Sequence, residues 1–367
     1  MGSRYLVTGG AGFIGRYLCE ALLEHGHQVR VLDSLVEQVH GVSPTPPDSV
    51  EFVRADMRDA TAVRGALRGV DGVFHLAAEV GVGQSMYEIT RYTGANDLGT
   101  AVLLEAMIDM PIERLVVASS MSVYGEGLYV APDKTALHQV RRDQGRMRLG
   151  LWDPVSVDGA PLTPVPTAEH KRVDLASIYA LNKYVQECSS LIFGATYSVD
   201  VVALRLFNVF GPGQALSNPY TGVLANFASR LLHGQSPMIF EDGEQKRDFV
   251  HVRDVARAFC LAMETPAAKG EVINIGSGRS YTIAQVATLL ASAMQSDRQP
   301  EILGKARSGD IRHCFADISK ATALLGFRPE YLLEETVGEV AAWVRQSEAV
   351  DRGLDARREL EARGLVA

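Results

Sequence analysis

A tyrosine and a lysine stand four positions apart, Tyr179 and Lys183, in the stretch "SIYALNKYVQE". On a helix the two side chains share one face. A free tyrosine has a pKa of about 10, and an ammonium about 4 Å away stabilises the phenolate by about 4 kcal/mol at an effective dielectric constant of 20, which would bring that pKa near 7. The pair therefore suits proton transfer. The same spacing also suits an ordinary amphipathic helix, so other features of the sequence are needed to distinguish the two interpretations.

Two hydroxyl groups stand at the end of an apolar run, "RLVVASS", which closes with Ser119 and Ser120. The run is typical of a buried strand. In an open parallel sheet, ligands bind beyond the carboxyl ends of the strands, so hydroxyls at this position can reach a substrate. Serines that cap a turn would have the same pattern.

Three glycines, Gly9, Gly12 and Gly15, directly follow the apolar run "RYLVTG" and open a stretch with helical spacing. Glycine lets the backbone turn tightly and approach a pyrophosphate, while the helix N-terminus offers unpaired N–H groups. The spacing is GxxGxxG rather than the more familiar GxGxxG. A tight strand-to-helix turn with no ligand is the alternative.

An acidic residue, Asp33, ends the next run, "QVRVLD", 18 positions after Gly15. A carboxylate there suits a ribose diol and repels a 2′-phosphate, and no arginine follows it directly, so the sequence predicts NAD rather than NADP. A solvated acid at the end of a strand would look the same. Asp56 follows the third run, where it suits either the adenine amine or a helix N-cap.

Short apolar runs alternate with helical patterns along the first half of the chain, which predicts parallel βαβ units and an α/β fold with a Rossmann-type, doubly wound sheet. The runs that we expect to be strands lie at 4–9, 28–33, 50–57, 72–78, 114–120, 200–211 and 271–278. The tail from residue 333 is typical of a charged amphipathic helix.

Residues 126–174 interrupt this alternation with prolines and charges, over a length that exceeds a normal connection. Between residues 134 and 148 this segment carries a net charge of +4, from Lys134, Arg141, Arg142, Arg146 and Arg148 against Asp143. One hypothesis is a lid that folds over the substrate or over an oligomer partner. The other is a solvated surface excursion. The segment offers no cysteine and only two histidines, so we expect no metal site in it.

Composition excludes several classes of protein. The chain has 367 residues, 47% of them apolar, and a net charge of −8, which suits two globular domains and argues against nucleic acid as a partner. No apolar run is long enough for a membrane span, and the first strand pattern begins too early for a signal peptide. Four scattered cysteines suggest buried thiols in a reducing compartment, so we expect a cytoplasmic protein. We expect His75 and His251, in apolar strand patterns, to be core residues.

Taken together, these pieces resemble a known family. The matching stretches are "TGGAGFIG", "HLAA", "ASSMSVYGEG", "YALNK", "LRLFNVFGPG", "RDFVHVRDVARA" and "RSGDIRHCFAD", and they span residues 7 to about 317. With them the sequence resembles the extended short-chain dehydrogenase/reductases, in the branch of nucleotide-sugar epimerases and dehydratases. Together, these stretches are highly specific for that family.

The resemblance implies a role for each matching residue. Tyr179 would be the general acid/base, Lys183 would hold the ribose and lower the tyrosine pKa, and Ser120 would bond the sugar hydroxyl that is oxidised. It implies tightly bound NAD, in contact with Gly9, Gly12, Phe13, Ile14, Gly15, Asp33, Asp56, Met57, Leu76, Ala77, Ala78 and Asn96. It implies a nucleoside-diphosphate sugar as substrate, in contact with Ser120, Ser122, Asn208, Phe240, Arg247, Arg307 and Asp310. Taken one at a time, the arginines also suit surface ion pairs, and Phe240 also suits the core.

The resemblance also implies two domains. Residues 1–206 with about 248–275 would form the NAD-binding Rossmann domain, which carries the irregular insertion at about 126–174. Residues about 207–247 with 276–367 would form a smaller α/β domain that binds the nucleotide sugar. A homodimer, formed through helices beside Tyr179, is a further expectation from the family.

The residues after Ser120 indicate which reaction to expect. Related 4,6-dehydratases carry an Asp–Glu pair there, and related decarboxylases carry a glutamate at the second position, whereas this chain has Met121 and Ser122. We therefore expect a 4-epimerase that works through a transient 4-keto sugar. A 4-ketoreductase or dehydrogenase of the same branch is the alternative, a 4,6-dehydratase a weaker one, and a non-catalytic NAD-binding regulator the weakest. The sugar and its base stay open among UDP-hexoses, UDP-uronic acids and dTDP-6-deoxyhexoses.

Overall fold

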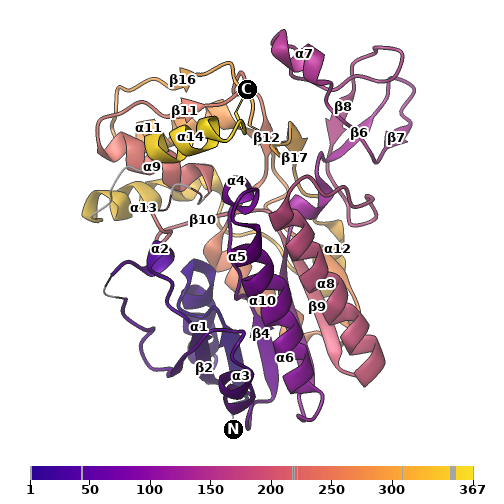
Figure 1. Cartoon of the computed structure of the whole chain (residues 1–367), viewed down its shortest axis with the longest axis vertical. Coiled ribbons are helices and arrows are strands. Elements are labelled where there is room, and N and C mark those ends of the chain that lie inside the picture. Colours follow the sequence, from indigo (N-terminus) through magenta and orange to yellow (C-terminus); the bar gives the residue numbers. More distant parts are fainter. Residues whose placement is uncertain are drawn as a thin grey trace.

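Seven parallel strands form the central sheet of the computed structural model, which describes residues 2–42, 44–216, 218, 220, 222–307, 309–347 and 353–366 (Figure 1). The strands are β1 (Arg4–Thr8), β2 (Gln28–Asp33), β3 (Glu51–Arg54), β4 (Gly72–His75), β5 (Arg114–Ser120), β9 (Asp200–Leu206) and β14 (Val272–Ile275). Their order is β14-β9-β5-β4-β1-β2-β3, so the direction of strand addition reverses between β1 and β4. This is the predicted doubly wound sheet, and the predicted fold class is confirmed.

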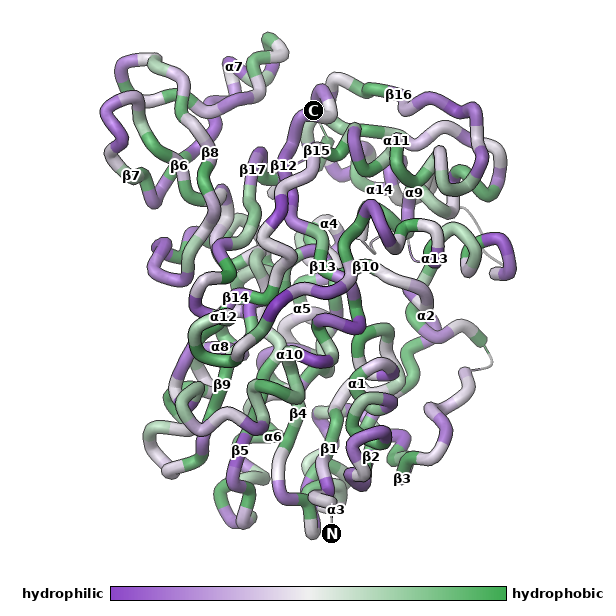
Figure 2. The backbone as a smooth tube through the Cα atoms, turned by 180° about the vertical axis from the view of Figure 1, so that it is seen from behind, coloured by the Kyte–Doolittle hydropathy of each residue, from purple (hydrophilic) through white to green (hydrophobic). Residues whose placement is uncertain are grey.

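Helices cover both faces of the sheet. On one face lie α1 (Phe13–Glu24), α10 (Val252–Glu264) and α12 (Ser319–Leu325). On the other face lie α3 (Ala60–Ala66), α6 (Gly99–Met107) and α8 (Ile178–Tyr197). Figure 1 is seen from the side of α6 and α8, and Figure 2 from the side of α1 and α10.

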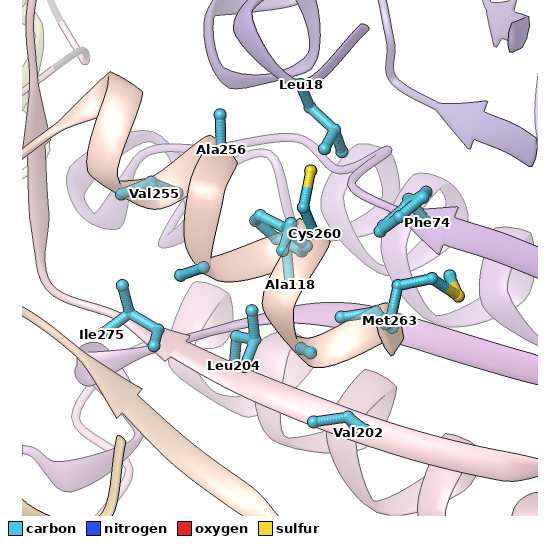
Figure 3. Packing of buried hydrophobic residues seen from close by; sticks show 14 of the residues in the cluster. Leu18, Phe74, Ala118, Val202, Leu204, Val255, Ala256, Cys260, Met263 and Ile275 are labelled. Atoms are coloured by element: carbon cyan, nitrogen blue, oxygen red, sulfur yellow. The ribbon is translucent and has the colours of Figure 1, made fainter. Parts of the chain in front are cut away.

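The strands are apolar because both faces of the sheet are buried. Along β1, Leu6 faces the cluster under α3 and α6, whereas Val7 faces the cluster under α1 and α10. Figure 3 shows this second cluster, in which Cys260 of α10 points toward Leu18 of α1, and Leu204 and Val202 lie on the strand below α10. In Figure 2 these strands are mostly green, the colour of apolar residues.

A group of short strands and helices outside the large sheet is named here the second domain, and it includes β13 (Phe249–His251), which the predicted bounds gave to the NAD-binding domain. The strands are β10 (Asn208–Phe210), β11 (Met238–Ile239), β12 (Lys246–Arg247), β13 (Phe249–His251), β15 (Tyr281–Thr282), β16 (Glu301–Ile302) and β17 (His313–Cys314). The helices are α9 (Val223–Leu232), α11 (Ile283–Ala293) and α13 (Leu333–Gln346), followed by α14 (Gly353–Ala362). The run predicted as a single strand at 200–211 is divided, because after Leu206 the chain leaves the large sheet and β10 pairs with β13 instead.

Residues 126–174 fold into a small lobe that projects beside the second domain (Figure 1). Strand β6 (Leu128–Val130) pairs antiparallel with both β7 (Ala136–Leu137) and β8 (Thr163–Val165). The short helix α7 (Gln144–Arg148) lies between β7 and β8 in the sequence. The segment is therefore a folded three-stranded unit rather than an irregular excursion.

Smaller elements complete the path of the chain. They are α2 (Glu37–His40), α4 (Val82–Ser85), α5 (Ile89–Thr93), a π-helical turn at Gly94–Leu98 and 3₁₀ turns at Met121–Tyr124 and Pro266–Ala268. Among the described residues, no helix combines the length and the apolar character needed to cross a membrane. Cys19, Cys260 and Cys314 are buried free thiols, whereas Cys188 on α8 is only half-buried and so departs from the expectation that all four are core residues.

Candidate active site

The three glycines form a close-packed turn between β1 and α1. Gly9 has a φ of +71°, and a Cβ there would lie 2.8 Å from the Ala77 nitrogen. A Cβ on Gly15 would lie 2.4 Å from the Gly9 carbonyl oxygen, so only glycine permits this approach of the helix to the strand. Gly12 is the N-cap of α1, and no side chain caps the helix there. The N-terminus of α1 therefore presents its backbone N–H groups to the cleft, as a pyrophosphate requires.

Asp33 ends β2 beside this turn. Its carboxylate accepts hydrogen bonds from the backbone N–H groups of Ala11, at 3.0 Å, and Leu35, at 2.9 Å. The Nε2 atom of His40 lies 3.5 Å from the same carboxylate. Burial raises the pKa of Asp33, but the hydrogen bonds from His40 and the two amides outweigh it, so the net pKa is lowered. The carboxylate is therefore charged at neutral pH, as a ribose-binding acid should be.

The chain after β4 forms the facing wall of the cofactor site. Leu76, Ala77 and Ala78 line the cleft, as predicted, but Asn96 does not. Asn96 is fully buried, and its carboxamide bonds both the N–H of Glu79, at 2.7 Å, and the carbonyl of Glu79, at 3.1 Å. It therefore fixes the loop that bears Ala77 and Ala78 rather than facing the cleft itself.

The two serines at the end of β5 point in different directions. The hydroxyl of Ser119 donates to Glu187 at 2.6 Å, and Glu187 forms a buried ion pair with Arg205. Ser120 lines the cleft, where its hydroxyl accepts a hydrogen bond from the Ser122 N–H at 3.1 Å. Ser119 lines the cleft as well, but its hydroxyl is engaged with Glu187, so Ser120, the serine to which the resemblance gives the catalytic role, is the better placed to bond a ligand.

Helix α8 carries Tyr179 and Lys183 on one face, and both line the cleft. Ser177 caps the helix by accepting the Ala180 N–H at 3.1 Å. The Lys183 ammonium donates to the Ala118 carbonyl at 2.7 Å and to Gln186 Oε1 at 2.9 Å. Burial lowers the pKa of Lys183 to about 7. A third N–H of this ammonium is left for a ligand in the cleft.

The pKa of Tyr179 shifts in the direction opposite to the one expected. Burial raises it to about 12, and a hydrogen bond with Ser120 opposes this rise only in part. The expected lowering by Lys183 is not found, because the ammonium is directed at Ala118 and Gln186. The protein alone therefore does not make Tyr179 a base near pH 7.

His75 and His251 are core residues, as predicted. His75 is buried between hydroxyls, with Nδ1 2.7 Å from Thr8 Oγ1 and Nε2 2.9 Å from Thr100 Oγ1. Burial lowers its pKa to about 3, so it is neutral. His251 is fully buried and accepts the Arg253 N–H at 3.2 Å.

The predicted substrate residues come from both the end of β5 and the second domain and meet in the cleft. All seven line it: Ser120, Ser122, Asn208, Phe240, Arg247, Arg307 and Asp310. The Arg307 guanidinium lies 4.6 Å above the centre of the Phe240 ring and pairs with Asp310 at 2.8 Å. Among the described residues, the buried Ser122 Oγ and Asn208 Oδ1 have no hydrogen-bond partner, as expected of groups that bond a substrate.

One continuous cleft of about 1100 Å³ joins these two sides. It contains every predicted catalytic and substrate residue and every predicted cofactor residue except Asn96. Its volume lies at the upper end of the range for small-molecule sites, as two ligands bound end to end would need.

The insertion at 126–174 contacts residues of the cleft wall but does not line the cleft itself. None of its residues lines the cleft, so the lid hypothesis has no direct contact to support it. Arg142, which is buried, pairs with Glu126 at 3.0 Å and with the carboxylate of Glu241, and donates to the carbonyl of Asp310 at 2.6 Å. Glu241 and Asp310 do line the cleft, so the insertion supports its wall from behind.

Sequence reasoning missed two parts of the cleft. One is a polar cluster at its rim, where Arg91 pairs with Glu79 at 2.8 Å and donates to Gln38 at 2.9 Å. The other is the C-terminal segment, of which Arg357, Leu360 and Leu365 line the cleft. Neither carries a motif. The i,i+4 pairs of the tail indicate only a helix.

Comparisons with known proteins agree with this geometry. A sequence model of the NAD dependent epimerase/dehydratase family matches residues 5–143 and 156–276. The dTDP-L-rhamnose 4-epimerase of Burkholderia thailandensis is 34% identical over 352 residues, which cover 94% of this chain and 96% of that protein.

Two solved structures resemble the whole chain. One is the UDP-N-acetylglucosamine 4-epimerase of Methanobrevibacter ruminantium in complex with UDP-N-acetylmuramic acid, with a TM-score of 0.77 and 31% identity, covering 94% of this chain and 99% of the other. The second is the UDP-glucose 4-epimerase of Thermus thermophilus in complex with NAD, with a TM-score of 0.75 and 30% identity, covering 94% of this chain and 100% of the other.

Proposed function

Because this chain belongs to the NAD dependent epimerase/dehydratase family, we propose that it is a nucleotide-sugar 4-epimerase that works through a transient 4-keto sugar. One observation carries the proposal. Ser120 and Tyr179 line the same cleft as the glycine turn, and the residues after Ser120 are Met121 and Ser122 rather than carboxylates. Elimination of water from the sugar needs an acid and a base at those positions, so a 4,6-dehydratase is disfavoured.

The cofactor site fits NAD. A Cβ at Gly9 or Gly15 would fill the turn that a pyrophosphate approaches, and the charged Asp33 suits a ribose diol. When bound, NAD supplies a reversible hydride acceptor and, in its oxidised form, a positive ring next to the reacting groups.

Residues of the chain then hold the substrate and transfer the proton. Ser120 holds the hydroxyl at C4, Tyr179 takes its proton and later returns it, and Lys183 holds the ribose with the N–H that Ala118 and Gln186 leave available. Since burial raises the pKa of Tyr179 to about 12, we infer that a positive charge brought by the ligand is what makes the phenol a base.

In this proposal Arg247 and Arg307 hold the diphosphate of the substrate. The Arg247 guanidinium is fixed by the backbone carbonyls of Lys246 and Arg312, each 2.9 Å away. A fixed guanidinium suits the planar, two-oxygen face of a phosphate. Phe240, already stacked under Arg307, offers a ring on which a base can stack.

The decisive experiment is incubation of the purified protein, without added cofactor, with a panel of UDP-, dTDP-, GDP- and CDP-sugars. Conversion to the C4 epimer, followed by NMR, together with about one NAD per chain after denaturation, would support the proposal. A reaction that needs added NADH in proportion to product would instead indicate a 4-ketoreductase. Absence of a C4 epimer with every sugar would overturn the proposal.

We also propose a homodimer formed through the helices beside Tyr179. Apolar side chains are exposed along α5, α6, α8 and their ends: Ile89, Leu98, Ile108, Leu181, Ile192 and Tyr197. Ile192, exposed to 67%, lies on α8 itself. Light scattering of the wild type and of Ile192→Asp tests this, since a dimer buried there would dissociate in the variant, whereas equal masses would exclude it.

A further inference from the structure

The C-terminal segment forms part of the wall of the cleft. Arg357 and Leu360 on α14, together with Leu365 after it, line the cleft on the side that also carries Phe240 and Arg307. Figure 1 shows α14 (yellow) lying across the second domain beside α9 and α11. A segment with no sequence motif thus reaches the side of the site where we place the nucleotide.

Contacts with the first domain fix one side of this segment. Leu360 is only 5% exposed, and its methyl groups lie against Gly83 of α4, where a Cβ would be 3.4 Å away. The Arg363 guanidinium lies 4.3 Å above the centre of the Tyr87 ring. The Tyr87 hydroxyl in turn lies 2.6 Å from that of Tyr220. The segment is therefore packed on the loop that follows the cofactor wall.

Contacts with the second domain fix the other side. Lys305 pairs with Glu361 at 3.2 Å. Val366 forms an antiparallel bridge with Arg307, the residue whose guanidinium stacks on Phe240. Residues 357–366 therefore span from α4 to the segment that carries the predicted substrate arginine, and they form part of the wall of the cleft.

Arg357 is the residue of this segment with a charge to offer a ligand. Its guanidinium pairs with Glu361 at 3.0 Å and lies 3.8 Å from the sulfur of Met238, two residues before Phe240. Three guanidinium groups, those of Arg247, Arg307 and Arg357, thus line one end of the cleft. The carboxylates of Asp310 and Glu241 line it as well, so only part of this positive charge is available for an anion.

We propose that residues 357–366 are a closing wall of the nucleotide end of the cleft and that Arg357 contacts the nucleoside diphosphate of the substrate. The inference rests on the proposed function, because it needs a nucleotide sugar in the cleft. A guanidinium binds phosphate oxygens or the carbonyl oxygens of a pyrimidine base, and both are acceptors of one nucleotide. A segment that is held by a few side-chain contacts can open at low cost to admit it.

The first test compares two neighbouring arginines on α14. Arg357→Gln removes the charge that faces the cleft, whereas Arg358→Gln makes the same change at an exposed residue outside the cleft lining of the described chain. Binding of UDP and of dTDP is measured by calorimetry. We expect Arg357→Gln to weaken binding of the preferred nucleotide about tenfold, the effect of one charge-assisted hydrogen bond, and Arg358→Gln to leave it unchanged.

Three outcomes separate the inference from the proposed function. Failure of both nucleotides to bind the wild type would count against the proposed function itself. Binding to the wild type with equal affinity for Arg357→Gln would overturn the inference alone. With the substrate found in the sugar panel, Arg357→Gln should raise KM about tenfold and leave kcat and bound NAD unchanged, because the contact is equal in ground and transition states.

A second test follows closure directly. Trypsin cleaves after arginines, and Arg357, Arg358 and Arg363 make the closed segment a cleavage site once it opens. We expect saturating UDP or dTDP to slow cleavage there in the wild type, and Leu360→Asp, which places a charge against Gly83, to accelerate it and abolish the protection. Cleavage at the same rate with and without nucleotide in the wild type would overturn the closing wall even if Leu360→Asp misfolds.

Discussion

Lys183 and Gln186 share a hydrogen bond on one face of α8, with Nζ of the lysine 2.9 Å from Oε1 of the glutamine. The other end of the carboxamide donates to Thr100 Oγ1 at 2.9 Å, and the same hydroxyl lies 2.9 Å from His75 Nε2. Gln186 thus ties the ammonium to a chain of neutral, buried groups. It positions the lysine without adding a charge that would change how the site titrates.

Gln186→Leu should therefore lower kcat about tenfold or more, because a hydrogen bond to a charged group contributes about 1.5–3 kcal/mol and only the Ala118 carbonyl would remain to orient the ammonium. Steady-state kinetics and the bound NAD content measure this. Gln186→Glu is the matched control, since it keeps an acceptor but raises the pKa of Lys183 and should move the alkaline limit of kcat upward. A wild-type kcat at all pH values in Gln186→Leu would show that Gln186 does not position the lysine.

Tyr179→Phe should lower kcat by about 10²–10⁴-fold, the usual range for removal of a general acid/base. KM for the sugar and the bound NAD should change little, because the ring still fills its buried position. Tyr184→Phe, on the same helix, is the control that should retain full activity. Equal kcat for Tyr179→Phe and the wild type would rule out the phenol as the proton acceptor.

Asp33→Asn should reduce the preference for NAD over NADP about tenfold, because the carboxylate repels a 2′-phosphate and its charge is lost while its shape is kept. The two cofactors are titrated by fluorescence into protein freed of cofactor. Asp48→Asn makes the same charge change at an exposed residue of the described chain and should leave the ratio unaltered. An unchanged ratio in Asp33→Asn would place the ribose elsewhere.

Lys183→Met should stabilise the protein more at pH 6.5 than at pH 9.5. Burial lowers the pKa of Lys183 to about 7 in the folded chain, so between about pH 7 and the unfolded value of about 10.4 the unfolded chain binds more protons. The contribution of this lysine to stability therefore rises with pH across that window and is least favourable below pH 7. Replacement of this lysine by methionine removes its contribution to the pH dependence of stability.

Thermal unfolding of Lys183→Met and of the wild type at the two pH values measures the difference. Lys269→Met, at an exposed residue, serves as the control, and its shift in Tm should be the same at both pH values. If the shift in Tm for Lys183→Met were also independent of pH, the ammonium would have an ordinary pKa in the folded protein.

Arg142→Met should destabilise the protein by about 3 kcal/mol, the lower end for a broken buried pair, because buried Glu126 loses its ion pair with Arg142 whereas Glu241 keeps its pair with Arg312. Arg141→Met, at the preceding residue, removes an exposed guanidinium that pairs with Asp174 and should cost about 0–1 kcal/mol. Urea unfolding of the two variants gives the comparison. Similar losses would mean that the insertion is held by other contacts.

Much of the fold could be predicted because a sheet that is covered on both faces has a simple sequence pattern. Strands buried on both faces are continuous apolar runs, and the glycine turn can occur only where β1 meets α1. The break at Leu206 could not be predicted, because "DVVALRLFNVFG" is apolar throughout and nothing in its pattern shows where β10 changes partner.

The candidate site, like the fold, could be predicted only in part. Tyr179, Lys183 and Ser120 could be singled out because they lie in stretches that resemble the family, whereas their spacing alone also suits an ordinary helix. The roles of Ser119, Asn96 and Gln186 depend on the direction in which each side chain points. The roles of Arg142 and Arg357 depend on which segments pack around the cleft. A local sequence pattern encodes neither of these properties. The raised pKa of Tyr179 in the protein alone could not be predicted, because burial, which outweighs its hydrogen bond, is a property of the packed chain, whereas the predicted lowering included the charge of the bound cofactor.

The buried carboxylate of Glu126 accepts the backbone N–H of Arg312, 186 positions later, at 2.8 Å, and Arg312 in turn pairs with Asp153 of the insertion and Asp242 of the second domain. We therefore expect the lobe at 126–174 and the second domain to unfold as one cooperative unit, despite their separation in the chain. In hydrogen exchange they should open together. A deletion that removes only the lobe would leave Arg312 paired with Glu241 and Asp242 but would take away Arg142 and Asp153, so loss of activity after such a deletion would not by itself show that the lobe is a lid.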